Sequence, residues 1–140
     1  MTAQTLARPD DVPASRGVAF GFFAFAVLCV AAGMVWGLVM AATHDHAMAP
    51  AHAHLNLVGW ATMGLFGLYY AVTPAAAESR LAKLHLPVAA AGVVAMVPGI
   101  ALAELGLGEG LAIVGSLLTL VSMAVFVAVV MRFGLGRPES

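Results

Sequence analysis

Residues 17–42 read GVAFGFFAFAVLCVAAGMVWGLVMAA, an apolar stretch that contains no charged residue. A helix needs about 20 mostly apolar residues to cross about 30 Å of lipid hydrocarbon, and inside lipid a helix pairs its own backbone polar groups. Three further stretches have similar length and composition, and they cover residues 51–73, 84–105 and 110–131. The sequence therefore predicts an all-α fold, a bundle of four transmembrane helices.

The composition of the whole chain agrees with a protein embedded in a lipid bilayer. Of its 140 residues, 62% are apolar and 9% are charged, whereas soluble domains average about 45–50% apolar and about 25% charged residues. Six Lys and Arg against seven Asp and Glu leave no basic surplus for binding phosphates, so nucleic acid is not expected as a partner. The single cysteine excludes disulfide frameworks and paired-cysteine metal sites.

One transmembrane domain is expected at residues 17–134, between a flexible leader at residues 1–16 and a short tail at residues 135–140. All six basic residues fall on one side of the predicted membrane: Arg8, Arg16, Arg80, Lys83, Arg132 and Arg137. Because Lys and Arg of short loops are retained in the cytoplasm, both termini are predicted to be cytoplasmic. The loop between the first two helices then faces the periplasm or exterior of a bacterial-type inner membrane.

Four of the five histidines lie close together in the sequence, at His44, His46, His52 and His54. Neutral imidazole binds zinc, copper and heme iron, and ionisable residues inside a membrane helix are costly and mostly functional. We therefore interpret this group as a candidate metal or heme site. His85 begins the third span, a membrane thickness away, and we interpret it as a solvated residue at the level of the lipid headgroups.

His52 and His54 point about 200° apart in a regular helix with 3.6 residues per turn, so both cannot face one ligand. The residues that share a helix face with His52, three or four positions apart, form a more polar face that we expect to turn into the bundle: Asn56, Gly59, Met63, Gly67 and Tyr70. The residues that share a helix face with His54 form an apolar face with room for a flat ligand: Val58, Ala61, Leu65 and Leu68. This geometry leaves both histidines open as ligands.

Small residues recur at helical spacing in the first and last spans. Gly33 and Gly37 form a GxxxG pair, and Gly115 with Thr119 forms a second pair of small residues. Small residues let helix backbones approach closely in lipid, where the lipid tails are as apolar as leucine. The pairs indicate close helix packing and do not by themselves indicate a dimer.

Residues 54–74 read HLNLVGWATMGLFGLYYAVTP. This string resembles the second transmembrane helix of subunit I in the heme-copper oxidase superfamily, most closely in its nitric oxide reductase branch. That family helix begins with a histidine near the external face and continues with Asn, Trp, paired glycines, a Tyr pair and Pro. The resemblance implies that His54 is an axial ligand of a low-spin heme b. It also implies that Asn56, Trp60 and Tyr70 tune this heme through hydrogen bonds and polarity.

The remaining metal ligands of that family come from later helices, which a chain of four helices lacks. A complete oxygen-reducing or NO-reducing centre is therefore not expected, and the sequence favours a protein without enzymatic activity. We expect a short relative of subunit I that acts in electron transfer with a respiratory-chain redox partner, or that binds a diatomic gas. The second axial ligand stays open among several candidates: His46, His44, Met48, Met40, His54 of a second copy in a homo-oligomer, or no protein ligand at all.

A different class of function also agrees with the histidines. In this alternative, the chain is a non-catalytic copper-binding or zinc-binding membrane protein that serves metal handling or oxidase assembly. The four ligands are His44, His46, His52 and His54, gathered at the external face.

Overall fold

A computed structural model describes residues 17–136 of the chain. The predicted leader at residues 1–16 and most of the predicted tail lie outside the described residues, and the described part contains helices and no strand. In chain order these helices are α1 (Val18–Thr43), α2 (Ala49–His54), η2 (Leu55–Thr62), α3 (Met63–Val72), α4 (Pro74–Ala77), α5 (Arg80–Glu104) and α6 (Gly110–Phe133).

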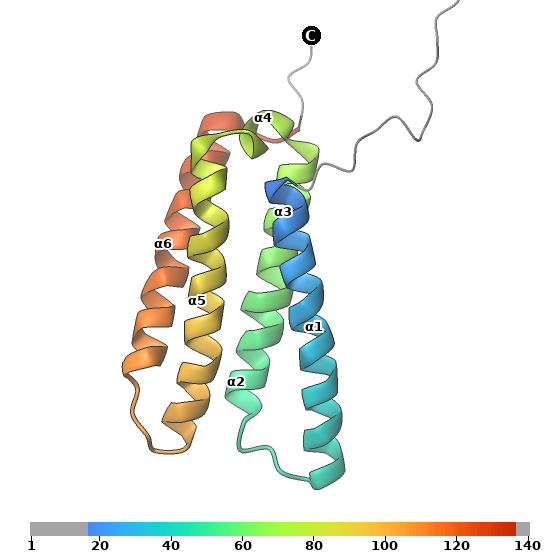
Figure 1. The fold of residues 1–140 in the computed structure, drawn as a ribbon, viewed down its shortest axis with the longest axis vertical. Helices are drawn as coiled ribbons and strands as arrows, with labels where there is room; N and C mark the ends of the chain where they lie inside the picture. Colours follow the sequence, from blue (N-terminus) through green and yellow to red (C-terminus); the bar gives the residue numbers. More distant parts are fainter. Residues whose placement is uncertain (1–16, 137–140) are drawn as a thin grey trace, which may run out of the picture.

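Four long helices stand side by side and alternate in direction (Figure 1). The segments α2, η2 and α3 follow one another without a break as a single helix, Ala49–Val72, which we call the second helix. It packs mainly against α1, while α5 packs mainly against α6. We call the end that carries α4 the α4 end, and the opposite end, where α1 connects to α2, the histidine end (Figure 1). The prediction of an all-α, four-helix bundle is confirmed.

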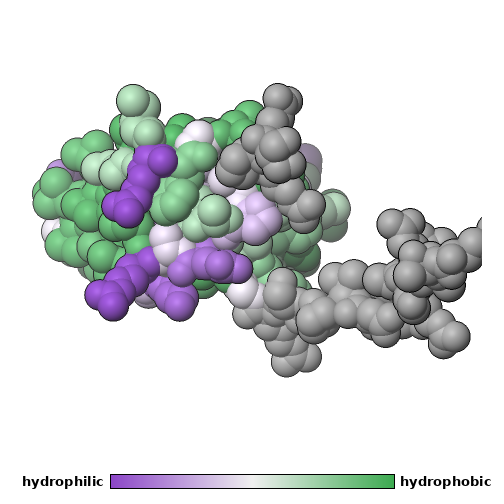
Figure 2. Space-filling view, turned by 90° about the horizontal axis from the view of Figure 1, so that it is seen from above, coloured by the Kyte–Doolittle hydropathy of each residue, from purple (hydrophilic) through white to green (hydrophobic). Residues whose placement is uncertain are grey.

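The outer surface of the bundle is apolar. All four long helices are long and apolar enough to cross a membrane, and large apolar side chains such as Leu28 and Met131 are mostly exposed. Figure 2, which looks onto the α4 end, shows hydrophilic residues gathered on part of this end face with hydrophobic residues around them. Such a surface is suited to lipid and not to water. The chain therefore has the architecture of a multi-pass membrane protein.

Local sequence explains where several helices begin and end. The Ser79 hydroxyl accepts a hydrogen bond from the Ala82 amide at 3.1 Å and caps the start of α5, as expected for a serine at this position. Pro50 and Pro74 occupy the first turns of α2 and α4, where a missing N–H costs nothing. His44 adopts the left-handed conformation with φ of 55°, which ends α1 and turns the chain into the loop.

The helices α5 and α6 approach closely at two glycines. Gly115 of α6 lies directly against the backbone of Met96 in α5, and Gly99 of α5 lies against the backbone of Leu111 and Ala112 in α6. Side chains at either position would force the helices apart. The prediction of close packing at Gly115 is confirmed, and Gly99 adds a second contact of the same kind.

Candidate functional site

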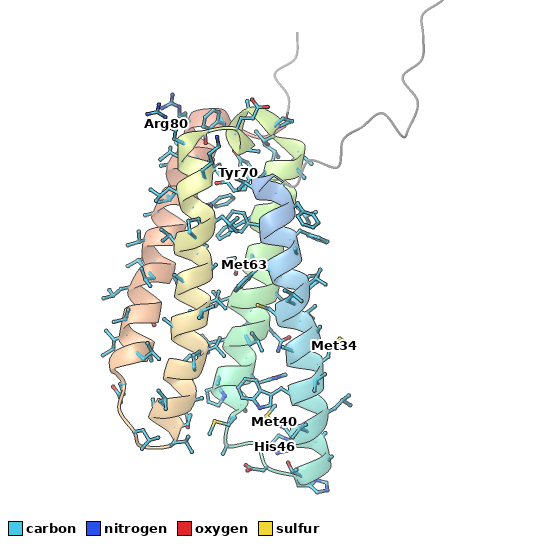
Figure 3. The ribbon with its side chains drawn as sticks, in the orientation of Figure 1. Met34, Met40, His46, Met63, Tyr70 and Arg80 are labelled. Carbon is cyan, nitrogen blue, oxygen red and sulfur yellow. The ribbon has the colours of Figure 1, made fainter. Side chains whose placement is uncertain are left out.

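The loop at the histidine end carries two exposed histidines, His44 and His46. Figure 3 shows His46 at this end of the bundle, beside the loop between α1 and α2. The Asp45 carboxylate accepts a hydrogen bond from the Ala47 amide at 2.9 Å, so it is used in the turn itself. Among residues 17–136, no three His, Cys, Asp or Glu side chains lie close enough to hold a metal ion. The geometry therefore gives no support to a shared four-histidine copper or zinc site, which stays a prediction.

His52 points toward α1 and packs beside Gly37 and Trp36. Its Cε1 lies 3.3 Å from the place that a Cβ on Gly37 would take, and the Trp36 ring meets it edge-on at 6.1 Å between ring centres. Asn56 occupies the neighbouring space, since its Oδ1 lies 2.6 Å from a Cβ on Gly33. The GxxxG pair therefore makes room for two polar side chains of the second helix.

The lone pair of the His52 imidazole is already engaged. The Asn56 amide nitrogen donates to the His52 carbonyl at 2.9 Å and lies 3.3 Å from the His52 Nε2. Because an amide NH₂ can only donate, Nε2 accepts and the ring proton resides on Nδ1. That Nδ1 is buried and has no hydrogen-bond partner in the described part of the chain. His52 thus packs against α1, with Nε2 beside the Asn56 amide and Nδ1 buried.

His54 has the opposite arrangement. Its Nδ1 lies 2.8 Å from the Pro50 carbonyl oxygen, and because a carbonyl can only accept, Nδ1 carries the proton. The lone pair is therefore on Nε2, for which residues 17–136 provide no hydrogen-bond donor. A backbone carbonyl that fixes one imidazole nitrogen and leaves the other free is the usual arrangement of a metal-binding histidine.

His54 lines an open, shallow groove of about 370 Å³ between the second helix, α5 and α6. We call it the His54 groove. Its walls are mostly apolar with two hydroxyls and two thioethers, and they consist of His54, Val58, Met96, Ser116, Thr119, Leu120 and Met123. The groove lies on the side of the second helix away from α1, so His52 and His54 serve different surfaces, as their spacing predicts.

The second helix widens into a π-helix immediately after His54. The segment η2 covers Leu55–Thr62, and the Thr62 hydroxyl donates to the Leu57 carbonyl five residues earlier at 2.9 Å. Turns of this kind are rare, occur mostly as single turns inside α-helices, and are frequent at functional sites. The widening changes which side chains of the following turns face α5 and α6.

Of the apolar face that follows His54 in regular helical steps, only Val58 lines the His54 groove. Below His54, the residues of the second helix that line the space toward α5 and α6 are Val58, Thr62, Met63 and Phe66. Leu65 and Leu68, which regular helical steps place on this face, are 66% and 54% exposed on the outside of the bundle. The steps assumed 3.6 residues per turn, and a π-helix has more residues in each turn. The face that follows His52 is buried as predicted, at Gly59, Met63, Gly67 and Tyr70.

The interpretation of His85 as a solvated residue is wrong. Its side chain has 0% exposure and forms two hydrogen bonds inside the bundle. Nδ1 lies 2.9 Å from the Tyr70 hydroxyl, and Nε2 lies 3.0 Å from the Ser122 hydroxyl. Both partners are themselves buried. The three side chains come from three helices and form a continuous polar chain, which we call the Tyr70–His85–Ser122 chain.

Aromatic rings enclose this polar chain near the α4 end. The His85 ring lies 4.6–5.7 Å, centre to centre, from three aromatic rings of α1, α3 and α6: Phe22, Phe66 and Phe126. Figure 3 shows Tyr70 inside the bundle at the same level. The apolar enclosure excludes lipid and bulk water, so each polar atom of the chain depends on its hydrogen-bond partner.

The structure thus separates the residues predicted to bind a cofactor. His52 and Asn56 are in contact, and His54 faces another side of the helix. Trp60 lies 6.4 Å from Phe23 of α1, centre to centre. Tyr70 lies sixteen positions after His54, about 24 Å along the helix axis, and its hydroxyl is committed to His85.

The chain was compared with protein-family models, with curated proteins and with solved structures, and none of them matches it. The likeness of residues 54–74 to heme-copper oxidase subunit I therefore stays a prediction.

Proposed function

We propose that the chain is a small membrane protein that binds heme b through His54, for electron transfer or for binding a diatomic gas. The observation that carries this proposal is the state of His54. Its Nδ1 donates to the Pro50 carbonyl, its Nε2 is free, and its ring lines an open groove. When bound, heme b supplies a one-electron centre, and an unoccupied axial position on its iron binds NO, CO or O₂.

The donors and walls of the His54 groove fit such a group. The imidazole supplies a neutral nitrogen ligand, and the hydrogen bond that Nδ1 donates to the Pro50 carbonyl orients the ring and makes Nε2 more basic. Val58 and Leu120 provide apolar walls for a flat macrocycle. Met96 lines the same groove, and its sulfur accepts a weak hydrogen bond from the Ser116 hydroxyl at 3.8 Å. Because thioethers bind heme iron, Met96 joins the candidates for the second axial ligand.

The openness of the groove supports a homo-oligomer as part of this function. Ser116 and Leu120 are exposed, so a group held by His54 would have a side that this chain does not cover. A second copy would cover that side and would offer its own His54 as a ligand. In that case, separating the copies in detergent converts a low-spin heme spectrum into a high-spin one. A low-spin spectrum that survives separation contradicts ligation shared between copies and favours Met96.

The substitution His54→Ala is expected to lower heme affinity by more than about 100-fold. Loss of a residue that merely orients a metal ligand costs about 10–100-fold in affinity, and this change removes the ligand itself. The measurement is a titration of the purified, heme-depleted protein with hemin in mild detergent, followed by the Soret absorbance.

The matched control is His46→Ala, which removes an exposed imidazole from the loop and is expected to leave heme affinity unchanged. Equal losses from substitutions at His44, His46, His52 and His54 would instead support metal chelation by the whole group. Unchanged binding in His54→Ala would refute the assignment of this ligand.

A further inference from the structure

Two arginines from different helices line one crevice at the α4 end. Arg80 begins α5, and Arg132 lies in the last turn of α6. The crevice is open, has a volume of about 420 Å³, and is also lined by Glu78, Ser79, Leu81 and Phe133. We call it the arginine crevice. Figure 3 shows Arg80 at the edge of the α4 end, and Figure 2 shows hydrophilic residues gathered on part of this end face.

Both guanidinium groups of the arginine crevice are available to a ligand. Arg80 and Arg132 are exposed, and within residues 17–136 neither side chain forms an ion pair or a hydrogen bond. The guanidinium carbon of Arg132 lies 5.5 Å from the centre of the Phe133 ring, a contact that favours its position beside the crevice. Because a guanidinium presents its N–H donors in a fixed fork, it pairs with two phosphate oxygens at once.

The start of α5 forms one wall of the crevice and adds unpaired backbone donors. The Ser79 hydroxyl accepts from the Ala82 amide, and the Ser79 carbonyl accepts from the Lys83 amide. The amides of Arg80 and Leu81 have no hydrogen-bond partner in the part of the chain that the structure describes. The positive end of the dipole of this helix, which has 25 residues, also favours an anion at the same place.

The charge of the crevice matches a phosphate diester. Glu78 brings a carboxylate to the crevice beside the two arginines. Two guanidinium groups and one carboxylate leave a single positive charge in excess at neutral pH. A phosphate diester carries one negative charge, so the charges of the ligand and the crevice complement each other.

The position of the crevice favours a lipid headgroup over a phosphate ion from solution. The four long helices have 24–26 residues, slightly more than about 30 Å of hydrocarbon requires, so their ends lie at the level of the headgroups. Leu81 and Phe133 are half-buried in the crevice wall. One turn further into the span, on the helix faces that carry the two arginines, Leu84 and Ala128 are exposed. Acyl chains can therefore extend along α5 and α6 from a phosphate held in the crevice.

Basic pockets between membrane helices bind anionic lipid headgroups. The α4 end is also the end that the sequence predicts to be cytoplasmic, where anionic lipids give the membrane a negative surface potential. We propose that the arginine crevice binds the phosphate of an anionic phospholipid, with Arg80 and Arg132 as its charged partners and the start of α5 as a further donor. This site needs no heme and is independent of His54.

Native mass spectrometry of the purified full chain in a non-ionic detergent tests this proposal. The probe is dioleoylphosphatidylglycerol, and dioleoylphosphatidylcholine is its zwitterionic counterpart with the same acyl chains. The wild-type protein is expected to bind the first phosphatidylglycerol more tightly than phosphatidylcholine. Each arginine contributes about fivefold in affinity, so the double variant Arg80→Gln/Arg132→Gln is expected to bind phosphatidylglycerol about 25-fold more weakly.

The matched control is Lys83→Gln, which removes a positive charge from the same end of α5 but not from the wall of the arginine crevice. It is expected to keep the wild-type affinity. Glu78→Gln removes the carboxylate from the crevice and is expected to strengthen binding, which gives a second test if the double variant loses helicity by circular dichroism.

Three results would overturn the proposal. They are equal binding of the two lipids by the wild-type protein, undiminished binding of phosphatidylglycerol by the double variant, and weaker binding by Glu78→Gln. Displacement of phosphatidylglycerol by inorganic phosphate would assign the crevice to a free phosphate ion and would likewise contradict a lipid as its occupant.

Discussion

Replacing His85 by leucine is expected to lower the free energy of unfolding by about 2–4 kcal/mol. The substitution leaves the buried hydroxyls of Tyr70 and Ser122 without their shared partner. A buried polar group without a partner costs about 1–3 kcal/mol, and hydrogen bonds between membrane helices contribute about 0.6–2 kcal/mol each. The measurement is equilibrium unfolding in mixed micelles with increasing SDS, followed by far-ultraviolet circular dichroism.

A triple variant separates the two parts of this cost. When His85→Leu is combined with Tyr70→Phe and Ser122→Ala, no unpaired polar atom is left in the cluster. Because apolar replacement of all partners is close to neutral, the triple variant is expected to recover much of the lost stability. His85→Leu with unchanged stability would contradict the contacts of this histidine. A triple variant less stable than His85→Leu alone would show that packing, and not hydrogen bonding, dominates.

The substitution Gly99→Ala is expected to lower the free energy of unfolding by about 1–3 kcal/mol, the usual cost of an added methyl group in a tightly packed contact. The new Cβ would lie 2.6 Å from the carbonyl carbon of Leu111 and closer still to the Ala112 amide nitrogen. These are backbone atoms, which move only if α6 moves away from α5. The same unfolding titration measures the effect.

Gly64→Ala is the matched control for Gly99→Ala. A Cβ at Gly64 would meet only the Ala26 Cβ, at the ordinary contact distance of 3.9 Å. Alanine favours the helix over glycine by about 1 kcal/mol, so this variant is expected to be as stable as the wild type or more stable. Equal destabilisation by both substitutions would contradict a specific close approach of α5 and α6 at Gly99.

The length and apolarity of each helix made the fold predictable from the sequence. The predicted spans agree with the observed helices to within four residues, and the largest difference is the start of α5 at Arg80 instead of residue 84. Arg80 and Lys83 are polar, so the hydrophobic pattern begins after them although the helix does not. Ser79 supplied the missing signal, because a serine directly before a helical stretch is a common cap.

The role of His85 was not predictable from spacing along the chain. Its partners lie 15 and 37 residues away, on α3 and α6, and only the packing of separate helices brings them together. One signal was available, because an ionisable residue at the edge of a membrane span is commonly functional. The π-helix after His54 was also not predictable, because the spacing of apolar residues does not indicate a local change in the backbone hydrogen-bonding pattern.

The different surroundings of His52 and His54 were predictable only in part. Their spacing showed that they face different directions, but it did not show which contacts each ring makes. The answer depends on two local contacts, the amide of Asn56 beside His52 and the carbonyl of Pro50 beside His54. Both contacts join residues four positions apart, so the helical spacing was readable in the sequence although the side-chain conformations were not.

Absorption spectra of the purified protein test the central claim most directly. The protein is prepared in mild detergent from heme-supplied cells, and oxidised and dithionite-reduced spectra are recorded with metal analysis of the same sample. Binding of heme b at His54 predicts a Soret band, sharp α and β bands on reduction, and bound iron. A colourless protein without iron would contradict heme binding, and copper or zinc in that sample would favour the metal-handling alternative.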